Sequence, residues 1–234
     1  MNKEVFVLIH SPLVGPLTWA LVADELRRVG VEVIVPLLHD AEDAKEPYWK
    51  QHAASVARAV AAVPAEQTLV LVGHSGAGPL LPAIRQMSGR PVTAYLFVDA
   101  VIPEAGASRL ALMAEESTEI AEEFRLALAS GERFPAWSDA DLAEVIPDGG
   151  LRRRMLAELR PRSLAFFEEP LPVFDSWPDA PCGYLKFTSA YERWEALARR
   201  NGWMCRELPG GHFHMLVNPA AVALELMNLR KGAT

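Results

Sequence analysis

Short, nearly continuous runs of apolar residues alternate with longer stretches in which apolar positions recur at helical spacing over the first part of the chain. Runs rich in Val, Leu and Ile are typical of parallel strands buried on both faces, and the helical spacing marks the helices that cover them. Predicted strands span 5–9, 31–35, 68–72 and 92–98, and predicted helices span 17–29, 48–63 and 78–87. We therefore expect an α/β fold with a mostly parallel, doubly wound sheet.

The alternation stops after the fourth predicted strand. Between 103 and 178 the pattern contains helical segments and no good strand, with candidate helices at 108–129, 139–145, 151–159 and 163–168. Strands at 184–187 and 204–208 follow, with helices at 191–200 and 219–229. The pattern predicts a core made of 1–102 and 179–234. The segment 103–178 is predicted to be a helical cap inserted over the end of the sheet where such folds bind ligands.

Composition supports one such core and limits the partners. Hydrophobic residues make up 50% of the 234 residues and the mean hydropathy is +0.09, which is ample material for a buried core. The net charge of −7 makes nucleic acid and anionic membranes poor partners, because both are themselves negatively charged. We expect a small-molecule substrate and a monomer or homodimer.

The N-terminal apolar run is too short for a secretion signal, and no apolar stretch is long enough to span a bilayer. The two cysteines, Cys182 and Cys205, lack the spacing of metal ligands and are expected to be buried, reduced thiols. These features predict a cytoplasmic protein without a metal site.

A serine stands at the junction of a predicted strand and a predicted helix. The strand at 68–72 runs into Gly-His-Ser-Gly-Ala-Gly at 73–78, with Ser75 at the apex. A sharp strand-to-helix turn places such a hydroxyl beside backbone N–H groups that can hold an oxyanion, and small neighbours are needed to avoid clashes. The usual pattern is Gly-x-Ser-x-Gly, and here Ala77 takes the last position and Gly78 follows it. The pattern predicts that Ser75 is a nucleophile.

The chain resembles the α/β-hydrolase superfamily, and in particular its small capped members related to plant esterases and hydroxynitrile lyases. Four segments carry the resemblance: 8–12 after the first strand, the turn around Ser75, 96–103, and the Gly-Gly-His-Phe-His segment that begins at 210. The resemblance extends over nearly the whole chain and implies a catalytic serine, acid and histidine in that order.

The resemblance places the general base at His212, directly after two glycines and the last predicted strand. A serine hydroxyl needs a neighbouring imidazole to accept its proton. His214, two residues on, is the competing candidate and is expected to be a packing residue.

The acid of the triad has two candidates. The family usually supplies it from the loop after the penultimate strand, where Glu192 is available but the usual Gly-x-x-Asp is absent. Asp99 follows the strand at 92–98, a position that some members of the superfamily use. A carboxylate there would be buried and would need a partner such as His212. Asp99 is the favoured candidate and Glu192 the alternative.

The oxyanion hole departs from the family pattern. The first donor is expected to be the N–H of Gly76, directly after the nucleophile. The second donor position falls on Pro12, which has no N–H. Leu13 N–H, or the N–H or hydroxyl of Ser11, is expected to replace it, because loss of one donor commonly costs about 10²–10³ in rate.

Candidate substrate-binding residues come from the turn and from the predicted cap. They are His74, Phe134, Trp137, Phe166 and Phe167, although most cap aromatics are expected to pack the cap onto the core. His39 and His52 have no motif around them and are expected at the surface. Glu168 and Glu169 are expected to be surface charges or a helix end.

The features together predict a serine hydrolase that cleaves a small carboxylic ester through an acyl-enzyme, without a cofactor. Two other interpretations remain open: a lyase, elimination or cyclisation enzyme that uses the same residues as an acid–base relay, and a non-catalytic ligand-binding member.

Overall fold

The computed structural model describes residues 4–233, which contain a six-stranded sheet. The strands are all parallel and lie in the order β2-β1-β3-β4-β5-β6. Their bounds are β1 Glu4–Ile9, β2 Glu32–Ile34, β3 Thr68–His74, β4 Val92–Val98, β5 Cys182–Lys186 and β6 Met204–Glu207. The predicted α/β class and doubly wound parallel sheet are confirmed.

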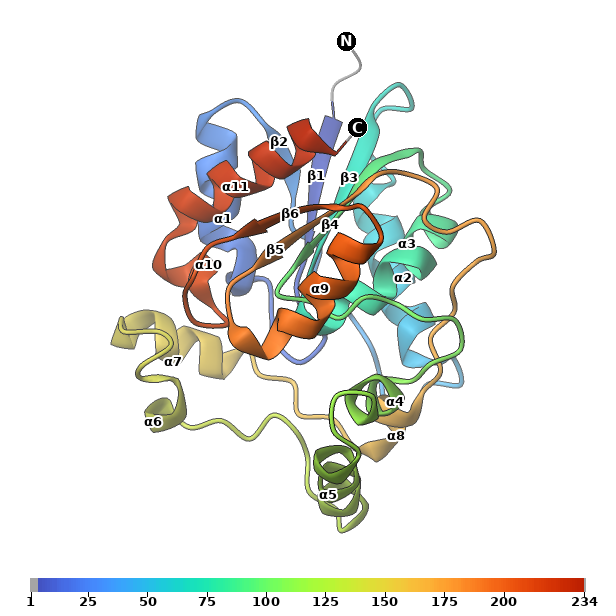
Figure 1. Cartoon of the computed structure of the whole chain (residues 1–234), viewed down its shortest axis with the longest axis vertical. Helices are drawn as coiled ribbons and strands as arrows, with labels where there is room; N and C mark the ends of the chain where they lie inside the picture. The colour runs from blue at the N-terminus through green and yellow to red at the C-terminus, as the bar shows by residue number, and fades with distance from the viewer. Residues whose placement is uncertain (1–3, 234) are drawn as a thin grey trace.

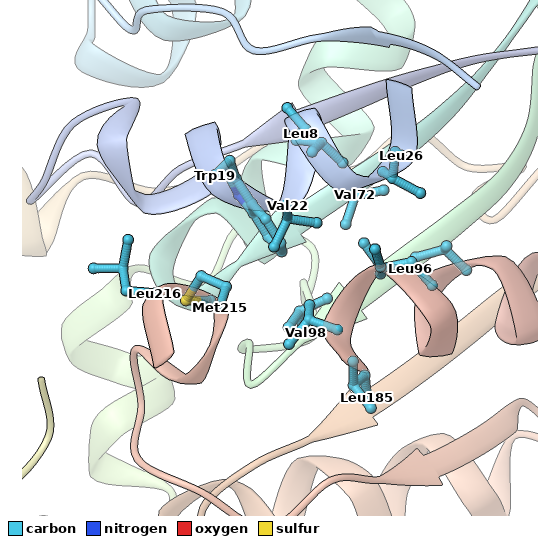
Figure 2. Packing of buried hydrophobic residues seen from close by; sticks show 14 of the residues in the cluster. Leu8, Trp19, Val22, Leu26, Val72, Leu96, Val98, Leu185, Met215 and Leu216 are labelled. Carbon is cyan, nitrogen blue, oxygen red and sulfur yellow. The ribbon is translucent and has the colours of Figure 1, made fainter. Parts of the chain in front are cut away.

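Helices cover both faces of the sheet, because alternate strand residues point to opposite sides. One face is covered by α1 (Leu17–Arg28), α10 (His214–Val217) and α11 (Pro219–Gly232). Figure 2 shows Trp19, Val22 and Leu26 of α1 directed toward Leu8 and Val72 of the sheet. The other face is covered by α2 (Tyr48–Val60), α3 (Leu81–Ser88) and α9 (Glu192–Arg200), which follows the short 3₁₀ helix η2 (Ser189–Tyr191). The continuous apolar runs of β1, β3, β4 and β5 are thus buried on both sides, whereas the edge strand β6 is mostly exposed.

Five further helices lie between β4 and β5 and gather beyond the carboxyl ends of the strands (Figure 1). They are α4 Arg109–Ala114, α5 Thr118–Ala129, α6 Asp139–Leu142, α7 Gly149–Ala157 and α8 Leu164–Glu168. All fall within the segment 103–178 that was predicted as the cap. Part of this group has a small apolar core of its own, made by Leu128, Phe166 and Phe167.

The single helix predicted over 108–129 is wrong, because the structure breaks it into α4 and α5. Ser117 accepts a hydrogen bond from the backbone N–H of Ile120 and so caps a new helix. The predicted helix at 78–87 also begins differently, as the 3₁₀ helix η1 (Ser75–Leu80) that leads into α3. Short α10 was not predicted. None of the helices within residues 4–233 combines the length and apolar character that a bilayer crossing requires.

Candidate active site

Strand order brings the predicted site residues to one place. Central β3 pairs with β1 through Ile9 and Gly73 and with β4 through His74 and Val98. Because parallel strands end at the same edge, the loops that follow β1, β3 and β4 emerge side by side. This edge of the sheet therefore holds the candidate oxyanion loop, the serine turn and Asp99.

Ser75 occupies a strained backbone conformation at the turn between β3 and η1. Its φ of 55° lies in the left-handed region that few non-glycine residues adopt. A side chain at Gly78 would overlap the backbone oxygen of Val101, whereas the small side chain of Ala77 is accommodated and fully buried. The glycine that the close approach requires is thus Gly78, which explains why the usual pattern is displaced by one residue.

Asp99 follows β4 and is fully buried, with a φ of 42°. Its Oδ1 accepts hydrogen bonds from the backbone N–H groups of Phe187 (2.8 Å) and Thr188 (3.1 Å). Its Oδ2 accepts one from the Thr188 hydroxyl (2.9 Å) and one from Nδ1 of His212 (2.8 Å). A carboxylate buried in this way is fully partnered and fixes the imidazole orientation.

The other candidate acid lies elsewhere: Glu192 is exposed at the start of α9. Among the two carboxylates proposed from the sequence, the structure brings Asp99 to the imidazole of His212.

His212 lies in the loop between β6 and α10, with a quarter of its side chain exposed. Its backbone oxygen accepts a hydrogen bond from Nε2 of buried His74 (3.0 Å). Burial lowers the pKa of His74 well below its ordinary value, so this ring is a neutral support under the loop. His214 packs against the ring of Phe187, as a packing residue does.

The hydroxyl of Ser75 is hydrogen-bonded to the hydroxyl of Tyr191, with an oxygen–oxygen distance of 3.3 Å. The ring of Tyr191 also lies parallel to the imidazole of His212, with centroids 5.2 Å apart and 3° between the planes. Burial raises the pKa of Tyr191, so its hydroxyl stays protonated. No hydrogen bond joins Ser75 to His212 within residues 4–233, although both side chains line one cavity.

The two candidate oxyanion loops lie against each other. Gly76 and Leu13 both line the cavity, whereas Ser11 is buried beside them. The Ser11 hydroxyl accepts a long hydrogen bond from the N–H of Leu13 (3.4 Å), and a side chain at Gly76 would meet the same hydroxyl at 3.2 Å. The structure thus places all three predicted oxyanion residues together.

The cavity has a volume of about 610 Å³ and its lining is mostly apolar. Phe134, Trp137 and Phe167, which were predicted to bind substrate, are among its lining residues. Phe166 does not, because it is buried in α8 beside Tyr48 and Phe167. His74 does not line it either, because it is fully buried under the His212 loop.

The sequence pattern of the alpha/beta hydrolase family matches residues 6–226. The chain belongs to this family. It is 24% identical over 253 aligned positions to a carbendazim hydrolyzing esterase of Nocardioides sp. (strain SG-4G), over 96% of this chain and 98% of that protein.

Solved structures share the fold of this α/β hydrolase. An extracellular alpha/beta-hydrolase from a Paenibacillus species superposes with a TM-score of 0.76 at 20% identity, over 97% of this chain and 99% of that one. Tomato methylketone synthase I, complexed with 2-tridecanone, superposes with a TM-score of 0.75 at 15% identity, over the full length of both chains. At these identities the likeness concerns the fold alone.

Tyr191 is the residue of this α/β hydrolase site that sequence reasoning missed. It lies in the loop after β5, where the family usually supplies the acid and where Glu192 was the residue predicted from the sequence. An aromatic residue in a segment that is expected to face the histidine was the available signal. This loop therefore contributes the ring and the hydroxyl of Tyr191 to the site, in place of the carboxylate of Glu192 that was the alternative prediction.

Proposed function

We propose that this α/β hydrolase cleaves small carboxylic esters, with Ser75 as nucleophile, His212 as general base and Asp99 as the acid that orients the imidazole. The observation that carries the proposal is the 2.8 Å contact between Asp99 and His212, beside a serine strained at a strand-to-helix turn in the same cavity. The esterase name of the Nocardioides relative supports the same reaction class.

In the proposed reaction, the Ser75 hydroxyl leaves Tyr191 and transfers its proton to Nε2 of His212 as Oγ attacks the ester carbonyl carbon. Asp99 stabilises the imidazolium through Nδ1. The N–H group of Gly76 stabilises the negative charge on the carbonyl oxygen, together with the N–H group of Leu13 once it leaves the Ser11 hydroxyl. The imidazolium then protonates the departing alkoxide, and the carbon–oxygen bond breaks to leave an acyl-enzyme.

Hydrolysis of the acyl-enzyme repeats these steps with water. His212 takes a proton from the water molecule, whose oxygen attacks the acyl carbon and forms the carboxylic acid product. The same proton returns to Oγ of Ser75 as the acyl–oxygen bond breaks. The reaction consumes one water per ester and needs no redox partner.

The decisive test is a Ser75→Ala variant compared with a Ser130→Ala control, in which an exposed serine at the end of α5 is changed. We expect wild type and the control to hydrolyse short p-nitrophenyl esters and to be labelled by a fluorophosphonate probe. Ser75→Ala should lose both properties. Substantial ester turnover by folded Ser75→Ala would rule out the proposal.

A second candidate function is an acid–base relay without an acyl-enzyme, as in a lyase or elimination reaction. The hydrogen bond between Ser75 and Tyr191 favours this second function, because the Ser75 hydroxyl is bonded to the tyrosine and not to the imidazole of His212. The absence of an N–H at Pro12 also weakens the oxyanion hole. An enzyme of this kind would resist the fluorophosphonate probe, whereas an esterase would be modified at Ser75.

A further inference from the structure

A buried arginine contributes to the wall of the candidate active-site cavity. Arg109 is the first residue of α4, its side chain is 9% exposed, and it lines the same cavity as Ser75 and His212. A guanidinium in an otherwise apolar wall is unusual, because charged groups are rarely buried without full pairing. The pairing of each Arg109 nitrogen therefore bears on what the cavity can bind.

Within residues 4–233, only one nitrogen of Arg109 has a hydrogen-bond acceptor. Nη1 donates to the backbone oxygen of Phe166 (3.2 Å), and the guanidinium lies 4.0 Å from the centre of the Phe166 ring. The carboxylate oxygen paired with it, Oε1 of Glu169, is 3.8 Å from Nη1, beyond hydrogen-bond range. The acceptors that the protein provides thus reach only one of the three guanidinium nitrogens.

The neighbouring carboxylates are occupied by other donors. Glu169 accepts the backbone N–H groups of Tyr48 (2.5 Å) and Trp49 (2.8 Å). Asp40 accepts two bonds from Arg162, at 2.5 and 2.6 Å, and one from His52. The surface position expected for His52 is wrong, because His52 is fully buried in this cluster. Glu169 stands at the end of α8, as one of its two expected roles required, and its side chain is 9% exposed. Neither carboxylate completes the pairing of Arg109.

The two donors of Arg109 that have no partner within residues 4–233 are Nε and Nη2, and both are buried. These nitrogens lie on the same edge of the planar guanidinium, and their parallel N–H groups match the two oxygens of a carboxylate. Burial lowers the pKa of Arg109 to about 10, so the group remains charged at neutral pH. Leaving such donors unpaired is costly, which indicates that an acceptor completes them.

We propose that a turn of the Arg109 side chain brings its buried Nε/Nη2 edge to the cavity, where it binds a carboxylate at the end of the substrate remote from the bond that is cleaved. This inference rests on the proposed ester hydrolysis and narrows its substrate class to esters that carry a free carboxylate, such as monoesters of linear dicarboxylic acids. The apolar wall that Phe134 and Phe167 contribute suits the methylene chain between the two ends. Glu116 is the one carboxylate among the described lining residues, and it is exposed.

The kinetic test compares two esters that differ only in this charge. One is p-nitrophenyl hydrogen adipate and the other is its methyl ester, p-nitrophenyl methyl adipate. The same pair of esters is made from longer diacids up to sebacate, because the distance from Ser75 to the carboxylate site sets the best chain length. We expect the wild type to favour the acid by about tenfold to a hundredfold in kcat/KM, the range that a charged hydrogen bond commonly contributes. Equal or faster turnover of the methyl esters at every chain length would overturn the inference.

Variants of Arg109 link the preference to this side chain. Arg109→Met should lose the preference for the acid, so that kcat/KM falls further for the acid than for the methyl ester. Arg109→Lys should retain part of the preference, because the charge remains but the fork is lost. Arg125→Met is the matched control, since Arg125 is a partly exposed arginine of α5 outside the cavity. Should Arg109→Met fail to fold, Arg109→Lys decides: an acid preference equal to that of the wild type would contradict the assignment.

A binding measurement separates failure of the inference from failure of the proposed function. Monomethyl adipate and dimethyl adipate are titrated into Ser75→Ala by calorimetry. The carboxylate site is supported if Ser75→Ala binds monomethyl adipate more tightly than dimethyl adipate and if the double variant Ser75→Ala/Arg109→Lys binds the monoacid more weakly. This result would hold even if the wild type hydrolyses no ester. Equal binding of the two compounds overturns the inference even if the wild type is an active esterase.

Discussion

The hydroxyl of Tyr191 holds the hydroxyl of Ser75 at 3.3 Å. The same tyrosine lies flat against the imidazole of His212, so it touches both the proposed nucleophile and the proposed base. A rotation of the serine side chain would exchange the tyrosine for the imidazole as its partner. The hydroxyl of Tyr191 would then be free to donate to an oxygen of the bound ester.

Tyr191→Phe keeps the parallel ring and removes only the hydroxyl. We expect kcat/KM for p-nitrophenyl esters to fall by about tenfold or less, the cost of one neutral hydrogen bond near the reacting atoms. Tyr191→Ala, which also removes the stacked ring, should lose more. A rise in the activity of Tyr191→Phe would mean instead that the hydrogen bond restrains Ser75 away from His212.

Asp99→Asn tests which carboxylate orients His212. The amide oxygen introduced by this substitution could still accept the backbone N–H groups that the carboxylate accepts, and asparagine tolerates the positive φ. The new NH₂ group would face Nδ1 of His212 and favour the wrong tautomer, so we expect kcat to fall by roughly 10³–10⁴. Activity is measured beside the melting temperature to verify folding.

Glu192→Gln is the matched control for Asp99→Asn, because it makes the same chemical change at the other candidate acid. We expect it to leave kcat nearly unchanged, since Glu192 is exposed at the start of α9. Loss of activity in Glu192→Gln with retention in Asp99→Asn would reverse the assignment.

The sheet could be predicted because its strands are buried on both faces and therefore read as uninterrupted apolar runs. Asp99 could be proposed for a related reason: a carboxylate that directly follows a buried strand needs a partner. Contacts between residues that are far apart in the sequence cannot be predicted from a local pattern in this way. Burial of His52 and Glu169 depends on Asp40, Arg109 and two backbone N–H groups that come from distant segments.

Tyr191 and Phe166 illustrate the same limit within the site. An aromatic residue in a loop or a cap can line a cavity or fill a core, and both uses bury the ring. Tyr191 faces the cavity because η2 places it beside the His212 loop. Phe166 lies in the apolar cluster with Leu128 and Phe167, where Arg109 and Phe167 pack on its ring. Tertiary packing determines whether such a ring lines a cavity or fills a core, and the local sequence does not predict which of the two occurs.

Gly78→Ala tests the displaced glycine of the serine turn. The added methyl group would overlap the backbone oxygen of Val101, which cannot move without disturbing the segment after β4. We expect the free energy of unfolding to fall by about 2 kcal/mol or more, as for other overpacked sites. Gly149→Ala at the start of α7 is the control, because its new methyl group would make only ordinary contacts. Similar urea midpoints for the two variants would contradict the prediction.

The protein contains three buried histidines, and we therefore expect its free energy of unfolding to fall at acidic pH. Burial lowers the pKa of His10 to about 4 and also lowers the pKa values of His52 and His74, whereas an unfolded histidine titrates near 6.5. The unfolded chain therefore binds more protons below pH 6.5, and stability falls as the pH drops from there toward 4. Urea unfolding should show a loss of about 1 kcal/mol or more between pH 6.5 and 5. A His39→Gln control, which changes an exposed histidine, should show the same loss of stability. A wild-type urea midpoint at pH 5 that equals or exceeds the midpoint at pH 6.5 would mean that the buried histidines do not cause acid destabilisation.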